Sequence, residues 1–295
     1  MSSPLDVVSA IQLLYWPLLL LFAVFVIISH VWKGNTSWLP ALAQFLILAL
    51  IQTVTAILGL SSKGAGGRRV LVASAILDDI AVAPLLIGLT EILIRVNSSL
   101  PSGIPFLALA TLQVLTILAA TLITIGDKVL LSQQPGASGE ALAGLGAVLF
   151  VIIFAAIFGL SLLSHRKTNG PSSANARGIS LSLLVVSSMA VLRLAWMLAT
   201  IFSSQERPLD RASPDLANVL LHFAMATFPE GVIAGYVLGA GFKSTNVKKD
   251  YTALEAEAAG TQHDEIPQLP ALYDQPSLTM DTKYEGNTEL SSPII

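Results

Sequence analysis

Seven long apolar stretches restrict this chain more than any other feature of its sequence. Each is long enough to cross the hydrocarbon core of a bilayer, which takes roughly 20 residues. Backbone polar groups in lipid need partners within the protein, and only helices and closed barrels provide them. The stretches lack the short alternating pattern of barrel strands, so we predict an all-α, polytopic bundle of seven transmembrane helices. The predicted spans are about Val7–Ser29, Leu39–Leu60, Val70–Ile94, Ile104–Ile125, Ala141–Ser161, Ile179–Phe202 and Leu216–Phe242.

The composition narrows the classes of function. Only 12% of the residues are charged, against about 25% in an ordinary soluble domain. The absence of cysteine excludes thiolate chemistry and cysteine-ligated metals. The four histidines are scattered, and no basic stripe indicates a nucleic-acid partner. We therefore expect no enzyme, no catalytic residue, no cofactor and no metal site, with membrane lipids as the surrounding partners.

The chain divides into two parts by charge. From Lys243 to the end, four lysines face nine acidic residues, which gives this segment a net charge of −5. It has few large apolar residues and no sustained period, so it cannot bury enough surface to fold. We predict a membrane domain over residues 1–243 and a disordered acidic tail over residues 244–295. The tail is expected to be solvated, with binding of a cytosolic partner as the alternative.

The distribution of basic residues gives a prediction of orientation. Eight Lys and Arg residues lie at the end of the predicted bundle that holds the C-terminus, and six lie at the opposite end. The positive-inside rule then places the N-terminus outside and the tail in the cytosol. The membrane is expected to be the plasma membrane or an endomembrane, and the sequence leaves the oligomeric state open.

Four ionisable residues fall well inside predicted spans. Asp78 and Asp79 lie in the third span, Arg193 in the sixth and Glu230 in the seventh. At 1.5 Å per residue, Asp78 lies ~12 Å, Arg193 ~14 Å and Glu230 ~21 Å from the same end of the bundle. His222 lies on a similar face of the seventh span at ~9 Å. The sequence therefore predicts a polar layer that connects the third, sixth and seventh spans.

Two interpretations of this layer remain open. An ionised group inside a membrane costs roughly 2.5–3.5 kcal/mol, so each needs a partner, water or neutralisation. In the functional interpretation, pairing with Arg193 leaves a carboxylate to bind a cation, a polar ligand or a proton. In the structural interpretation, a fixed ion pair and protonated acids only hold the helices together.

Proline and glycine add predictions about helix shape. Pro84 and Pro229 are expected to kink their spans, and Pro229 precedes Glu230 directly. Gly231, Gly235 and Gly239 recur every four residues, which predicts a ridge of small residues for close helix packing. A dimer contact through this ridge is the alternative.

Several short motifs resemble a family of uncharacterised seven-span membrane proteins of filamentous fungi. That family is similar in general organisation to the fungal lipid-translocating, toxicant-resistance proteins. The motifs are Ile11-Gln12-Leu13-Leu14-Tyr15-Trp16-Pro17, Ser37-Trp38-Leu39, Ala83-Pro84-Leu85-Leu86 and Phe228-Pro229-Glu230 followed by Gly235. The chain departs from the family at Ile51-Gln52-Thr53, where relatives usually carry Arg, and at the acidic pair Asp78-Asp79. The resemblance implies a membrane fold without an established activity.

These features lead to two expectations about function. The intramembrane charges and the resemblance favour a transporter-like protein or one that handles lipids or small molecules. The seven spans, the glycine ridge and the acidic tail favour the alternative, which is a receptor-like sensor or a membrane scaffold that acts through its tail.

Overall fold

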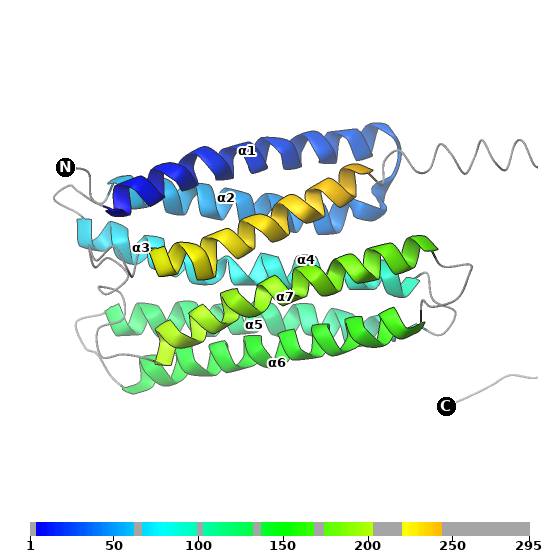
Figure 1. Ribbon diagram of the computed structural model, residues 1–295. Helices are drawn as coiled ribbons and strands as arrows, with labels where there is room; N and C mark the ends of the chain where they lie inside the picture. Colours follow the sequence, from blue (N-terminus) through cyan, green and yellow to red (C-terminus); the bar gives the residue numbers. More distant parts are fainter. Residues whose placement is uncertain are drawn as a thin grey trace, which may run out of the picture. The chain divides into compact units, whose positions relative to one another are not determined.

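The computed structural model describes residues 4–61, 67–98, 103–131, 137–167, 174–202 and 220–243, all within the compact unit Met1–Lys248. The regular elements in these ranges are all helical, and seven segments are long and apolar enough to cross a membrane. This confirms the predicted all-α bundle of seven spans (Figure 1). The predicted tail and the predicted start of the last span at Leu216 lie outside the described residues.

The helices are numbered in chain order, with a short 3-10 turn after the first span. The elements are α1 (Pro4–Trp32), the 3-10 turn η1 (Thr36–Trp38), α2 (Leu39–Ser61), α3 (Gly67–Ile80), α4 (Val82–Ser98), α5 (Phe106–Leu131), α6 (Ala137–Lys167) and α7 (Ala174–Phe202). The last span, Leu220–Lys243, is the unlabelled yellow helix in Figure 1 and contains a π-helical turn, η3 (Phe223–Thr227). Helix α1 packs mainly on α2, α5 packs on α6, and α4 contacts α2, α5 and α7.

The outer surface of the bundle is apolar. On α1, Leu14 and Leu21 are 71% and 66% exposed, and on α5 Leu107 and Val114 are 77% and 65% exposed. Soluble monomers rarely expose apolar surface of this extent, whereas lipid requires it. The helices therefore form a multi-pass membrane protein with its outer side chains in contact with lipid.

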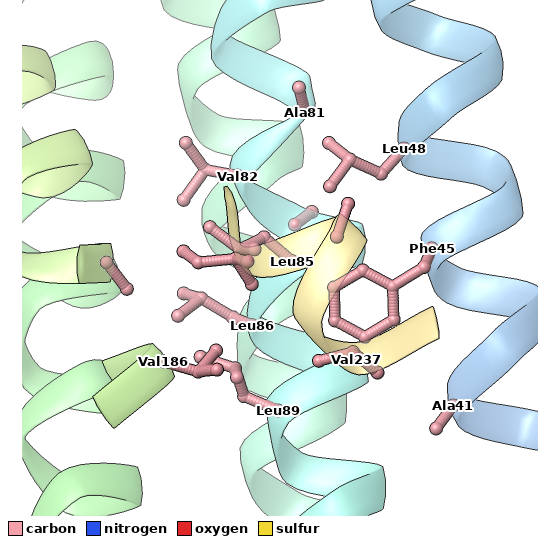
Figure 2. Close-up of a cluster of buried hydrophobic side chains, with 14 of the residues drawn as sticks. Ala41, Phe45, Leu48, Ala81, Val82, Leu85, Leu86, Leu89, Val186 and Val237 are labelled. Carbon is pink, nitrogen blue, oxygen red and sulfur yellow. The ribbon is translucent and has the colours of Figure 1, made fainter. Parts of the chain in front are cut away.

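The apolar core extends through the bundle and includes the region where α2, α4 and the last span meet. Figure 2 shows Phe45 of α2 extending toward α4 and toward Val237 of the last span, with Leu85 and Leu89 of α4 nearby. Phe45 packs against Gly88 so closely that a Cβ at Gly88 would lie 2.8 Å from its ring. This packing fixes α4 against α2 next to the polar layer.

The third span, Val72–Ser98, contains a one-residue break in its helix, close to the Pro84 that the sequence predicts to kink it. Helix α3 ends at Ile80 and α4 begins at Val82, with Ala81 between them. Pro84 has no N–H to donate to the carbonyl of Ile80, and its ring crowds that carbonyl. The helix is therefore disturbed about one turn before Pro84, directly after Asp78 and Asp79.

The last span also departs from regular α-helix. In η3, the N–H of Phe228 donates to the carbonyl oxygen of Phe223, five residues earlier. Pro229 follows at once and cannot donate to Met225 within this turn. Gln12 of α1 donates through Nε2 to Thr227 Oγ1 over 2.7 Å and holds the turn in place. The irregular turn directly precedes Glu230.

The predicted glycine ridge is only partly a packing surface. A Cβ at Gly231 would lie 2.5 Å from the Tyr15 ring of α1, so this position requires glycine. Gly235 has only ordinary contacts, and a Cβ at Gly239 would meet no described atom within 4 Å. Closer helix contact occurs between α5 and α6, where Cβ atoms at Gly126 and Gly146 would meet backbone atoms at 2.5 and 2.7 Å.

Candidate functional site

Arg193 of α7 forms the centre of a buried polar cluster. Its side chain is 0% exposed. Nε donates to Oε1 of Glu230 on the last span, and Nη2 donates to the main-chain carbonyl of Asp78. Nη2 also lies 3.2 Å from Oδ2 of Asp78. One guanidinium thus joins α7 to the third span next to the break at Ala81 and to the last span next to its π-helical turn.

Gln52 of α2 links the two carboxyl groups. Its Nε2 donates to Oε2 of Glu230 over 2.6 Å and to Oδ1 of Asp78 over 3.3 Å. Gln52 is 1% exposed and Glu230 is 0% exposed, so these bonds form away from water. With the Arg193 contacts included, each of the four carboxylate oxygens of Asp78 and Glu230 accepts a hydrogen bond or an ion-pair contact.

His222 lies at the edge of the cluster. Its Nε2 is 3.2 Å from Oδ2 of Asp78, and its side chain is 26% exposed while that of Asp78 is 5% exposed. The indole of Trp196, one turn beyond Arg193 on α7, meets the His222 ring edge-on with 5.5 Å between centroids. His222 is therefore the member of the cluster that is most accessible, and it lies nearest the end of the bundle where α1 begins.

Asp79 is buried next to this cluster, with 4% exposure. It is close enough for its charge to act on Arg193. The direct side-chain contacts to Arg193, Gln52 and His222 come from Asp78. Consecutive helical residues point about 100° apart, which explains why only one member of the pair faces the guanidinium.

The predicted residues meet in one cluster, although the predicted depths of Glu230 and Arg193 differ. The count along the spans places Glu230 about 7 Å deeper than Arg193, yet the two are in direct contact. That count starts at Leu216, outside the described residues. From Leu220, where the described span begins, Glu230 lies ~15 Å along the helix, close to the ~14 Å of Arg193. Asp78, Arg193, Glu230 and His222 form one cluster, with Asp79 beside it.

Sequence reasoning did not assign Gln52 to this site. Gln52 appears there only within Ile51-Gln52-Thr53, as a departure from the resembling family. One feature of the sequence could have indicated Gln52. It stands where the resembling family usually carries Arg, and two acids are buried in the next span. Trp196 has no comparable signal, because an aromatic residue in a span is usually a packing residue.

Two comparisons with known proteins bear on identity. No curated protein matches the chain. A family model described as a domain of unknown function, DUF7702, matches residues 3–247, which include every described helix and the whole polar cluster. The chain therefore belongs to the DUF7702 family.

Proposed function

We propose that the protein is a proton-coupled carrier of a small polar solute, in which Asp78 and Glu230 exchange the proton. One observation carries the proposal: a guanidinium and two carboxyl groups are buried together where the helix of the third span breaks at Ala81 and the last span contains a π-helical turn. Buried ionisable residues mark proton relays and substrate paths in membrane proteins. No catalytic role is proposed.

Charge balance supports a proton as the coupling ion. Within the described part of the cluster, Asp78 and Glu230 share the guanidinium of Arg193, so their ionised forms outnumber its one positive charge there. A metal ion would have to displace the donors that already occupy their four oxygens. A proton neutralises the excess without new ligands, which makes it the simpler coupling ion.

The contacts also supply a path for the proton. His222 combines partial exposure with contact to Asp78, and an imidazole can both donate and accept through its two ring nitrogens. Asp78 and Glu230 then meet at the amide of Gln52. We expect protons to enter through His222 and reach Asp78. They then redistribute to Glu230 as the third and last spans rearrange.

The test is proton movement in proteoliposomes that contain a pH-sensitive dye. A panel of small acids, amides, amines and lipids is added, and wild type is compared with Glu230→Gln. Lipids belong in the panel because of the resemblance to lipid-translocating proteins. Glu91→Gln is the matched control, because Glu91 lies in the same span as Asp78 but contacts Gln113 of α5 instead of the cluster.

The expected result is solute-dependent proton movement in wild type and Glu91→Gln that is lost in Glu230→Gln. If no solute moves protons and Glu230→Gln only lowers the melting temperature, the cluster is structural. A sensing or scaffolding role through the tail would then be the better proposal.

A further inference from the structure

One nitrogen of the buried guanidinium has no acceptor. Of the five N–H groups of arginine, the one on Nε and those on Nη2 face Glu230 and Asp78. Nη1, which carries the remaining two, is completely buried and has no hydrogen-bond partner among the described residues. An unpaired buried donor on a charged group is costly, so this nitrogen indicates a place for an acceptor that the described residues do not supply.

Trp196 offers a second donor about one turn along the same helix. Its Nε1 is also buried without a partner, and its ring contacts His222, which contacts Asp78. Trp196 follows Arg193 by three residues on α7, so both side chains start from one face of the helix. Trp16 and Trp38 have similar unpaired N–H groups in other places, so the indole counts here only because it adjoins Arg193.

The unpaired groups are hydrogen-bond donors, and this restricts the chemical class of the ligand. A cluster with more acids than bases invites the expectation of a cation. The carboxylate oxygens are already engaged, however, while the unpaired groups are N–H donors. Donors repel an ammonium group or a metal ion and attract an oxygen acceptor. The local chemistry therefore favours a ligand that accepts hydrogen bonds.

We propose that the solute is a small carboxylate, bound through its oxygens by Nη1 of Arg193 and Nε1 of Trp196 and carried together with a proton. This inference rests on the proposed function and names its substrate class. Guanidinium is the side chain best suited to carboxylate oxygens. A carboxylate adds a negative charge to the site, and protonation of Asp78 or Glu230 offsets it. Coupling to protons thus follows from the charge of the ligand.

The first test follows the indole N–H signals of the full-length protein, labelled with 15N and held in detergent micelles. The signal of Trp196 is assigned by its loss in Trp196→Phe. Lactate is then compared with lactamide, which lacks the charge, and with methylammonium, which lacks the acceptors. We expect lactate alone to shift the Trp196 signal in a saturable way. A signal that does not move with lactate, or that moves equally with methylammonium, overturns the proposal.

The second test measures lactate affinity by calorimetry. Trp196→Phe keeps an aromatic ring at this position but removes the N–H together with the five-membered ring, and we expect about tenfold weaker binding. Trp38→Phe is the matched control, because Trp38 has an unpaired indole N–H next to Arg95 of α4 instead of Arg193. Unchanged affinity in Trp196→Phe would contradict the assignment.

The two proposals fail in different ways. Proton movement that depends on Glu230 but follows lactamide or methylammonium instead of lactate would retain the carrier and reject the carboxylate. Saturable lactate binding without proton movement in liposomes would retain the ligand and reject proton-coupled transport. Liposomes without protein correct for passive entry of lactic acid.

Discussion

Arg193 donates through Nε to Oε1 of Glu230, and both side chains are fully buried. The pair joins α7 to the last span directly after the π-helical turn. A buried ion pair forms only when the attraction and hydrogen bonds offset the loss of hydration, so each partner depends on the other.

Removal of one partner should therefore cost more stability than removal of both. Arg193→Leu leaves Glu230 and Asp78 without their cation, and we expect a loss of about 3–5 kcal/mol in the free energy of unfolding. The double variant Arg193→Leu with Glu230→Leu should regain part of that loss. Unfolding in mixed micelles measures both. A double variant less stable than Arg193→Leu would contradict mutual compensation.

Gln52 should contribute to stability through its two bonds to carboxyl groups. Gln52→Leu removes a donor shared by Glu230 and Asp78, and we expect a loss of about 1–3 kcal/mol. Gln44 of α2 is the control, because it is only partly buried and its side chain lies beside Gly88, away from the acids. Gln44→Leu should change stability by less than about 0.5 kcal/mol. Equal effects in the two variants would argue against the bridge.

His30 makes a testable contact at the opposite end of the bundle. The ring is 0% exposed, and Nδ1 lies 3.1 Å from the carbonyl oxygen of Asn35, while Nε2 lies 3.0 Å from that of Gly241. Carbonyl oxygens only accept, so both contacts are hydrogen bonds only when both ring nitrogens carry hydrogen. The C-terminal ends of α1 and the last span meet here, and helix C-termini favour a cation.

15N spectra of histidine-labelled protein show which His30 nitrogens carry hydrogen, and hence which of the two contacts are hydrogen bonds. We expect His30→Phe to lower the free energy of unfolding by about 1–3 kcal/mol, because two carbonyls lose their donor. His165→Phe is the comparison, since His165 is only partly buried near the same end and contacts Ser180. A neutral ring with one bare nitrogen would show that only one contact is a hydrogen bond.

The sequence predicted the seven spans and their polar layer because length and charge in lipid are strong signals. It did not locate the break at Ala81, since a proline shows that a helix is disturbed but not at which residue. It also missed Gln52, because an uncharged amide in a span has many candidate partners until helix rotation is known. The depth of Glu230 depends on where the last span begins, and residue patterns locate such a boundary only to within a few residues.

The close contact of α5 and α6 provides a prediction with an internal control. A Cβ at Gly146 would lie 2.7 Å from the carbonyl oxygen of Ala119 and 3.0 Å from the backbone N of Ile123, so the two helices must separate. We expect Gly146→Ala to destabilise the protein by about 1–3 kcal/mol. Gly159 lies on the same helix with no described atom within 4 Å of its Cβ position, so Gly159→Ala should stabilise by up to about 1 kcal/mol through helix propensity. Melting temperatures in one detergent test both, and a Gly146→Ala protein as stable as Gly159→Ala would mean that α5 and α6 do not pack through their backbones.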